Sequence, residues 1–468
     1  MAPWFANFSC SPFSPPDTPC TVGPLPWYAV NASNAEDVRK TVKFTTTHNI
    51  RLVIRSTGHD YLGKSTGAGA VSIWTHHLKD IDFLHYHSPR YTGPAMRIGA
   101  GVQGMEAMAD AHCHGIVLVT GNCPTVGITG GYTQGGGHGQ LVSRFGLAAD
   151  QVLEWEVLTA SGKVLVASPS RNSDLYWALC GGGGSTYAIV LSMTVKVYPE
   201  LRTTAATLSF TSAGVSGDTF WSVIREFITG ILPLIDAGGV AVWLATETLF
   251  TVTPVTIPGG DMNQLEGGLR STIDMLKHYN MTYNYDIREF PSFWASYQEM
   301  NPPSNITEFQ LGGRLMPRST IENNTTALIN SLQKIIQYGA IVSGISLNVS
   351  RILPPDNAVN PAWRDTGIHI TLGTPFDYTN RDIDIANQKL MTNTLVPLLE
   401  ALSPNGGAYL NEADWNQADW QWNFYGRNYQ KLEKIKDKYD PHQIFYGLTA
   451  VGSERWVEQM DGRLCRSK

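Results

Sequence analysis

The apolar runs in the first 200 residues are short and are separated by glycine-rich or polar turns. Continuous apolar runs predict buried strands at 50–54, 69–74, 96–102 and 187–197. Residues 152–168 form two strand-like segments on either side of a Ser161-Gly162 turn, which predicts a hairpin. The pattern therefore favours a sheet-rich N-terminal domain.

Three stretches predict helices around these strands. Ser33 and Glu36 form a capping-box pattern for a helix that runs to about His48. Asn172 precedes the helical stretch DLYWALC, and the tail NYQKLEKIKDKYDP (428–441) is an amphipathic helix ended by proline. From about 200 to 410 the segments are longer, aromatic-rich and poorer in glycine, which predicts a second, α+β domain.

Composition restricts the class of protein. With 468 residues, two domains are the default, and 43% hydrophobic with 16% charged residues is typical of a folded globular chain. The net charge of -6 provides no basic field for nucleic acid or an anionic membrane, and no apolar run is long enough to span a bilayer. The 45 glycines are clustered, which indicates backbone packed closely against a ligand.

Cysteines and glycosylation sequons favour a secreted protein. Cys10 and Cys20 flank a Pro-rich loop that suits a disulfide. Seven sequons occur, at Asn7, Asn31, Asn280, Asn305, Asn323, Asn324 and Asn348. The start MAPWFANFSC lacks the features of a signal peptide. Either such a peptide was removed before this numbering begins, or the protein is intracellular; we expect the former.

Two glycine-rich stretches carry the candidate chemistry. IRSTGHDYLGKSTGAG (54–69) places His59 in a turn after a strand, and GNCPTVGITGGYTQGGGHGQ (121–140) contains Cys123. Backbone amides in such loops can line a pyrophosphate, although no GK[ST] closes a Walker A loop here. The alternative is a packing loop at a tight sheet corner.

Other motifs are weaker. GAGVQG (99–104) matches a dinucleotide fingerprint, but no acidic residue follows at the ribose position, so we interpret it as a tight turn before a packed helix. HYH (85–87) and HCH (112–114) lack zinc-ligand spacing, and we expect no metal site. A Cys-His hydrolase would need an elbow motif beside Cys123, and none is present.

The order RSTGHD, GNCPTVGITGGYTQGGGHG and NFYGRNYQKLEKIKDKYDPHQIF resembles the berberine-bridge-enzyme-like branch of the vanillyl-alcohol-oxidase flavoproteins, over essentially the whole chain. The closest likeness is to secreted fungal isoamyl-alcohol-oxidase-like proteins. The resemblance implies a monomeric, two-domain α+β fold of the PCMH type. Its FAD-binding domain (1–200) would be completed by a C-terminal segment (413–468), and a central antiparallel sheet (201–412) would form the substrate domain.

The resemblance also implies a bicovalent FAD, with His59 joined to the flavin 8α-methyl carbon and Cys123 joined to C6. Backbone of 55–60 and 130–139 would hold the pyrophosphate and ribityl chain. The implied cofactor-binding residues are Arg55, Ser56, Thr57, Gly58, His59, Asp60, Cys123, Val126, Thr129, Gly130, Gly131, Gly135, Gly136, His138, Gly139, Gly146, Leu147, Asp150, Val190 and Asn428. Gly146, Leu147, Asp150 and Val190 would lie along the adenine, and Asn428 would return to the flavin ring.

The catalytic residues depart from the plant pattern. Tyr132 stands where a histidine is common, and YLNEAD has Glu412 in place of a second tyrosine. If 408–412 is a strand, Tyr409 and Asn411 share one face and Glu412 the other. We favour Tyr409 as a phenolate-type base. Glu412 is the alternative, as a general acid or base whose pKa an apolar pocket raises, or else as a surface acid.

Three functions remain open from the sequence. The favoured one is a secreted oxidase that passes a hydride from an alcohol, carbohydrate or secondary metabolite to flavin N5, with O2 reduced to H2O2. The second is an isomerase or cyclase that uses Glu412 on the same scaffold. The third is a flavin- or ligand-binding protein without turnover. Substrate-dependent bleaching of the flavin separates the first from the other two.

Overall fold

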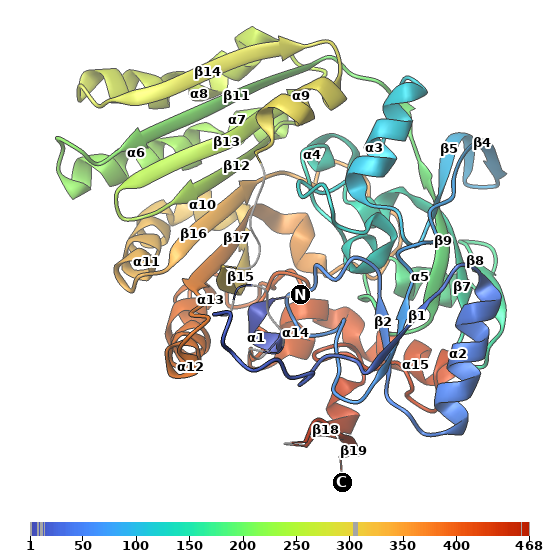
Figure 1. The fold of residues 1–468 in the computed structure, drawn as a ribbon. Coiled ribbons are helices and arrows are strands. Elements are labelled where there is room, and N and C mark those ends of the chain that lie inside the picture. The colour runs from blue at the N-terminus through green and yellow to red at the C-terminus, as the bar shows by residue number, and fades with distance from the viewer. Residues whose placement is uncertain are drawn as a thin grey trace.

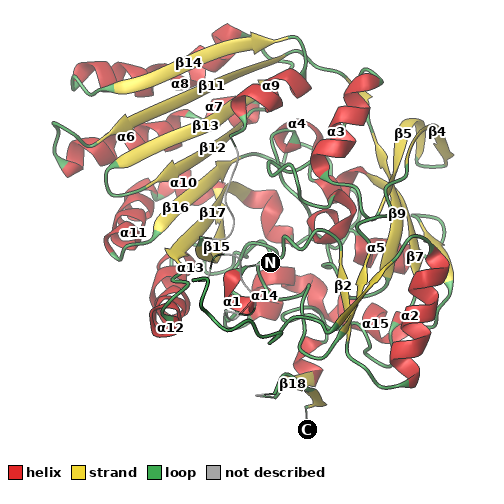
Figure 2. Cartoon of the chain, in the orientation of Figure 1, coloured by secondary structure: helices red, strands yellow, loops and turns green. Residues whose placement is uncertain are grey.

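The computed structural model describes residues 2–6, 9, 13, 15–302, 308–459 and 461–467. It has two parts, which Figure 1 shows side by side: a large twisted sheet with helices behind it, and a part formed by the two ends of the chain. The strands of the second part are shorter and carry long connections, drawn in green in Figure 2. This arrangement confirms the predicted two-domain α+β fold.

The N-terminal part contains two small sheets. A parallel sheet has the order β1-β3-β2, and an antiparallel sheet has the order β4-β5-β9-β7-β8. The strands are β1 (Tyr28–Asn31), β2 (Leu52–Arg55), β3 (Val71–Trp74), β4 (Ile81–Ser88), β5 (Tyr91–Gly99), β7 (Val152–Leu158), β8 (Val164–Ala167) and β9 (Ile189–Lys196), with a further pair β6 (Ile116–Val117) and β10 (Tyr198–Pro199). The predicted hairpin at 152–168 is therefore confirmed as β7 and β8.

Helix α2 (Ala35–Thr47) connects β1 to β2 and begins one residue later than predicted. Its N-cap is Asn34, whose Oδ1 accepts the Asp37 amide at 3.0 Å, while the Ser33 amide donates to the Asp37 carboxylate at 3.1 Å. The capping residues are thus Asn34 and Asp37, because an asparagine cap competes well with serine. The turn at 99–103 leads into helix α3 (Gly104–Cys113), as predicted.

The central part is a seven-stranded antiparallel sheet of order β14-β11-β13-β12-β16-β17-β15. Its strands are β11 (Thr203–Thr211), β12 (Val240–Ala245), β13 (Leu249–Pro258), β14 (Tyr283–Phe290), β15 (Phe309–Pro317), β16 (Ile341–Ser346) and β17 (Thr366–Pro375). Helices lie behind it in Figure 1: α6 (Gly217–Gly230), α8 (Met262–His278) and α11 (Thr325–Gln337). Shorter helices are α1 (Pro3–Ala6), α4 (Val142–Phe145), α5 (Ser173–Leu179), α7 (Leu232–Asp236), α9 (Phe293–Met300), α10 (Arg318–Asn323), α12 (Arg381–Leu390) and α13 (Val396–Glu400).

Strand alternation gives this sheet two different faces. In β17, Ile368 and Ile370 belong to the core that the helices share with the sheet. Since successive side chains point to opposite faces, His369 and Thr371 lie on the other face. That face is directed toward the N-terminal part, and Thr371 lines the cavity described below.

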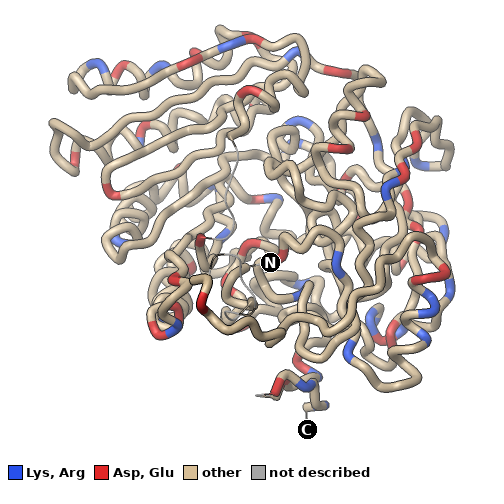
Figure 3. The backbone as a smooth tube through the Cα atoms, viewed as in Figure 1, with Lys and Arg blue, Asp and Glu red and all other residues tan. Residues whose placement is uncertain are grey.

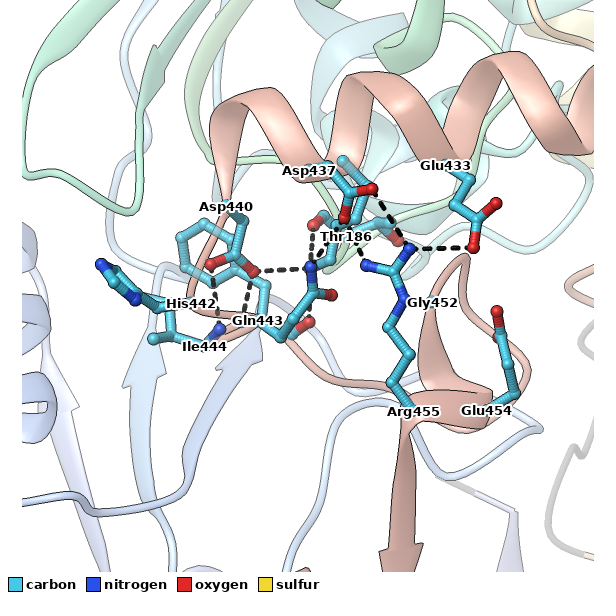
Figure 4. Close-up of polar contacts among 12 residues, drawn as sticks. Thr186, Glu433, Asp437, Asp440, His442, Gln443, Ile444, Gly452, Glu454 and Arg455 are labelled. Atoms are coloured by element: carbon cyan, nitrogen blue, oxygen red, sulfur yellow. Dashed lines mark hydrogen bonds and ion pairs between the residues drawn. The ribbon is translucent and has the colours of Figure 1, made fainter. Parts of the chain in front are cut away.

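The C-terminal segment returns to the N-terminal part through α14 (Trp420–Tyr425) and α15 (Tyr429–Tyr439), and ends with the hairpin β18 (Trp456–Glu458) and β19 (Leu464–Arg466). Lys436 of α15 is buried and its Nζ donates to Asp440 Oδ2 at 2.6 Å, Thr186 O at 2.7 Å and Phe445 O at 2.7 Å. Figure 4 labels Thr186 and Asp440, two of these partners, beside Arg455, which donates to Glu433 at 2.8 Å and pairs with Asp437 of α15.

The surface has no marked separation of charge, since basic and acidic residues are interspersed along the chain in Figure 3. In the part of the chain that the structure describes, no helix is long and apolar enough to cross a membrane. Cys10 lies outside the described residues, so its pairing with Cys20 stays a prediction. Cys113, Cys123, Cys180 and Cys465 are unpaired thiols.

Candidate active site

A cavity of about 460 Å³ lies between the N-terminal part and the inner face of the seven-stranded sheet. One wall comes from the connection that follows β2 and from the glycine-rich stretch. The opposite wall comes from the sheet, through Leu311, Ser343, Ile345 and Thr371. The segment 409–412 closes the cavity between the two walls. The two glycine-rich motifs, which are about 65 residues apart in the sequence, therefore meet in one place.

Most of the residues expected from the resemblance line this cavity. They are Ser56, Thr57, Gly58, His59, Asp60, Cys123, Val126, Thr129, Gly130, Gly131, Tyr132, His138, Val190, Tyr409 and Glu412. The remaining expected residues do not line it: Arg55, Gly135, Gly136, Gly139, Gly146, Leu147, Asp150 and Asn428.

Asp150 is placed away from the cavity because its carboxylate is already fully bound. It accepts hydrogen bonds from Nη1 and Nη2 of Arg364, both at 2.8 Å, and from the side-chain amide of Asn357 at 2.7 Å. It also accepts the backbone amide of Leu147 at 2.9 Å, and a side chain on Gly146 would lie 2.9 Å from the same carboxylate. These three residues thus have a structural role, and their expected contact with the adenine stays a prediction.

The other displaced residues also have structural partners. Asn428 donates its side-chain amide to the carbonyls of Ala358 and Val359, both at 3.2 Å, rather than returning to the cavity. A Cβ on Gly139 would lie 1.9 Å from the Thr120 carbonyl oxygen. These contacts hold the frame behind the cavity wall.

His59 and Cys123 are brought together at Thr125. The Thr125 hydroxyl lies 2.7 Å from His59 Nε2 and 3.8 Å from Cys123 Sγ. His59 follows Gly58, which has φ +79° and where a Cβ would lie 2.6 Å from the Arg55 guanidinium, so glycine is needed before the histidine. Burial lowers the pKa of His59 to about 4, which leaves a neutral imidazole at neutral pH.

Residues 408–412 form a turn and not a strand. The Glu412 amide donates to the Tyr409 carbonyl at 2.9 Å, which bends the chain. Tyr409, Asn411 and Glu412 consequently all line the cavity, and the prediction that Glu412 faces away from Tyr409 is wrong. Asn411 fixes the turn against the glycine-rich stretch by donating to Tyr409 Oη and to Gly131 O, both at 2.8 Å.

Glu412 lies between two histidines. His369 Nε2 is 2.8 Å from Glu412 Oε2, and His138 Nε2 is 3.2 Å from the same oxygen. The His369 side chain is fully buried, whereas that of Glu412 keeps 27% exposure toward the cavity. Burial raises the pKa of Glu412, but His138 and His369 outweigh it and hold the pKa well below its usual range. The predicted raised pKa is therefore wrong, and Glu412 is a carboxylate.

The ligand atoms of these three residues lie within 4.8 Å of one another, close enough to hold a metal ion. The Nδ1 atoms of both histidines are buried and have no hydrogen-bond partner among the described residues. Metal-bound histidines commonly donate this second nitrogen, and here a donor would find no acceptor. The arrangement fits better with two imidazoles that donate Nε2–H to the carboxylate.

The tyrosines are less suited to act as bases. Burial, with the Glu412 charge nearby, raises the pKa of Tyr409 far above its usual value. Tyr132, whose hydroxyl donates to the His138 carbonyl at 3.1 Å, has its pKa raised in the same way. The raised pKa of both phenols disfavours a phenolate, and the role of Tyr409 as the base stays a prediction.

Several residues that line the cavity or contact Glu412 were not predicted from the sequence. His369 comes from the alternating run GIHITLG, whose pattern identifies a two-faced strand but not the residue that it meets. Tyr61, Lys64 and Ser65 follow the His59 turn directly and could have been included by proximity. Asn411 was recognised only as a neighbour of Tyr409.

Comparisons with known proteins agree with this geometry. An FAD binding domain model matches residues 26–168, and a berberine and berberine-like model matches residues 408–451. The FAD-linked oxidoreductase sor8 of Hypocrea jecorina is 47% identical over 468 residues, which cover 100% of this chain and 81% of the relative. The bifunctional decalin synthase calF of Penicillium decumbens is 39% identical over 483 residues, 100% of this chain and 83% of calF.

The crystal structure of the VAO-type flavoprotein MtVAO615 from Myceliophthora thermophila superposes with a TM-score of 0.95 at 40% identity, covering 100% of this chain and 87% of that chain. None of these three relatives is described as an isoamyl-alcohol oxidase, so that finer likeness stays a prediction. The two matched models, the relatives and the superposition together show that the chain belongs to the berberine-bridge-enzyme-like, PCMH-type family of FAD-linked oxidoreductases.

Proposed function

We propose that this protein is an oxidase that carries FAD bound covalently through His59 and Cys123 and removes two electrons from an alcohol-type carbon of a small molecule. Dioxygen is the proposed electron acceptor and H2O2 the product. The observation that carries the proposal is the position of the Glu412 carboxylate on the same cavity as His59 and Cys123.

The lining of the cavity suits a flavin dinucleotide in its chemistry. Where Gly184 and Gly131 meet, the wall of the cavity is formed by backbone alone. A Cβ on Gly184 would lie 3.0 Å from Gly131 Cα, so there is little room for a side chain. Three buried polar atoms of lining residues have no partner within the described chain: Lys64 Nζ, Asn122 Oδ1 and His138 Nδ1. A polar cofactor would satisfy such groups, which are costly when left unpaired.

FAD, when bound, supplies the two-electron acceptor and passes the electrons to dioxygen. The protein must then bind the substrate and take the hydroxyl proton. Glu412 is an ionised carboxylate open to the cavity, so it can accept that proton. His138 and His369 hold the carboxylate in place through their Nε2–H groups and keep it charged.

The two proposed attachment residues have suitable chemistry. The neutral His59 imidazole has a free electron pair at neutral pH, which bond formation to a flavin carbon requires. Cys123 is a free thiol at the cavity wall. Thr125, within reach of both side chains, keeps them on the same side of the cavity.

The test combines denaturation with reduction. Acid-precipitated protein should stay yellow and carry an FAD-sized mass increase, which only the double variant His59→Ala/Cys123→Ala should lose completely. Alcohols, oligosaccharides and polyketide alcohols are then mixed anaerobically with the protein, and a substrate should bleach the flavin. Free flavin in the acid supernatant would contradict the two tethers, and product formation without bleaching would contradict the oxidase.

A second candidate function is a cyclase or isomerase acting on a natural product. It is favoured by one observation, the 39% identity to a relative described as a bifunctional decalin synthase. The low pKa of Glu412 speaks against acid catalysis by this residue, since the carboxylate holds no proton to donate. Conversion of a polyene by protein whose flavin stays oxidised would favour this candidate.

We also propose that the protein is monomeric and extracellular. The sequon residues Asn31, Asn280, Asn323 and Asn324 are exposed and can carry glycans, whereas Asn7 and Asn305 lie outside the described residues. Asn348 is buried and donates to Asp236 at 2.6 Å, so a glycan there is incompatible with the fold. Glycopeptide mapping of protein from a fungal secretory host should find glycans at exposed sequons and none at Asn348, and light scattering should give one chain per particle.

A further inference from the structure

Lys64 is a buried basic side chain in the wall of the cavity. It lies five residues after His59, in the connection between β2 and β3, and keeps only 8% exposure. A Cβ on Gly447 would lie 3.0 Å from Lys64 Cγ, so the aliphatic stem packs against backbone. The Nζ atom is buried and has no hydrogen-bond partner within the described chain.

The charge of the nearby Asp60 carboxylate raises the pKa of Lys64, but less than burial lowers it. Asp60 accepts the amide of Leu62 at 2.9 Å, and the amide and hydroxyl of Ser65 at 3.1 and 3.2 Å. Lys64 Nζ makes no hydrogen bond to Asp60 or to any other described residue. Among the described residues that line the cavity, Lys64 is the only lysine, and there is no arginine. An ammonium group buried without a partner is unfavourable, and burial lowers the pKa of Lys64 to about 8.

We propose that Lys64 is the cationic subsite of the cavity and binds an oxyanion of the molecule held there. The inference rests on the FAD site proposed above. Because Lys64 belongs to the wall built by the FAD-binding part, close to the His59 turn, the diphosphate of the dinucleotide is the source that its position favours. A carboxylate or phenolate on the substrate has the same chemistry and is the other source.

The subsite would act by a charge-assisted hydrogen bond, which is stronger than a neutral one and requires a lysine or arginine. The substitution Lys64→Met keeps the length of the side chain and removes the charge. Two opposite effects are expected. Binding of the anionic ligand weakens, whereas the ligand-free protein becomes more stable because an unpaired buried charge is removed. A lysine with only a structural role would not produce this combination.

The experiment uses the double variant His59→Ala/Cys123→Ala, in which flavin binding is reversible, with and without Lys64→Met. Riboflavin, which has no phosphate, serves as the matched ligand for FAD. Lys163→Met, at an exposed hairpin position, is the matched control for charge, and Lys64→Arg should restore binding. If Lys64 binds the diphosphate, Lys64→Met should raise the Kd for FAD about tenfold and leave the Kd for riboflavin unchanged.

If Lys64 instead binds an oxyanion of the substrate, Lys64→Met should leave the Kd for FAD unchanged. In the enzyme with covalent flavin, benzoate then perturbs the flavin spectrum in wild type but not in Lys64→Met, while benzyl alcohol acts equally on both. Either result supports the subsite. Unchanged binding of FAD and of benzoate, or a lower unfolding midpoint of ligand-free Lys64→Met, overturns it. A wild-type protein that binds no FAD at all would instead refute the proposed function.

Discussion

His369 Nε2 lies 2.8 Å from Glu412 Oε2, although one residue comes from the seven-stranded sheet and the other from the turn that leads back to the FAD-binding part. The contact joins the two domains at the cavity. Together with His138 at 3.2 Å, it places two imidazoles on one carboxylate. The carboxylate is thereby fixed in position and kept ionised, which is what a base for a substrate hydroxyl requires.

Replacement of Glu412 by glutamine should abolish most of the turnover while leaving flavin attachment intact. The amide keeps the shape of the side chain but cannot accept the proton, so the rate of anaerobic flavin reduction should fall by about 10²–10⁴-fold. Stopped-flow absorbance with an alcohol that bleaches the wild type measures this rate. Tyr409→Phe, which removes a phenol that keeps its proton, should cost less than tenfold; a larger loss than in Glu412→Gln would assign the base to Tyr409 instead.

The pH dependence of flavin reduction should reveal the histidines. A carboxylate base works only above its pKa, and that of Glu412 is held below the usual value of 4.5. The acid limb, where the rate of wild-type flavin reduction falls as the pH is lowered, should therefore lie below pH 4.5. In His369→Gln one group that lowers this pKa is gone while burial still raises it, so the limb should move to higher pH.

The matched control for this measurement is His112→Gln. His112 lies 2.9 Å from Glu200, outside the cavity, and its loss should not move the limb. A profile that is the same in wild type and His369→Gln would show that His369 does not set the charge state of Glu412.

Local patterns predicted the fold and one side of the site well. The strands near His59 and Cys123 follow from short apolar runs, and glycine marks the positions where backbone must approach closely. The opposite side depends on contacts that no local pattern contains. His369 lies on the polar face of an alternating strand, but the alternation does not indicate that this face meets Glu412, 43 residues later.

The structure departs from two expectations for different reasons. The alternation rule assigned Tyr409 and Glu412 to opposite faces because it assumes an extended strand, and a hydrogen bond from the Glu412 amide to the Tyr409 carbonyl bends this segment. Asp150 was chosen by its place in the motif, yet its partner Arg364 is 214 residues away. The first departure is a local bend within four residues, and the second depends on long-range pairing.

Thr125 should control how efficiently the flavin becomes attached. Its hydroxyl lies between His59 and Cys123, at 2.7 and 3.8 Å, and orients both side chains. In Thr125→Val the share of acid-stable flavin should drop several-fold, because both nucleophiles lose a fixed orientation, whereas Thr125→Ser should behave as wild type. In-gel flavin fluorescence after denaturation measures this share. Equal fluorescence in all three proteins would exclude a role of the hydroxyl in attachment.

Lys436 should be essential for stability and for the cavity wall behind the flavin. The Lys436–Asp440 pair is buried, with 1% and 0% exposure of the two side chains, and Lys436 also holds the Thr186 carbonyl next to the lining residues Gly184 and Ser185. Lys436→Met leaves the Asp440 carboxylate without its counter-ion, which costs about 3–5 kcal/mol of unfolding free energy.

The neighbouring Lys438 provides the matched comparison for this prediction. Its side chain is 60% exposed and pairs with Asp174 at 2.5 Å, so Lys438→Met should cost about 1 kcal/mol or less. Urea unfolding of the three proteins compares these free energies. Since the Thr186 segment borders the cavity, Lys436→Met should also retain less flavin, whereas Lys438→Met should not. Equal stability of the two variants would mean that the buried pair does not anchor the C-terminal segment.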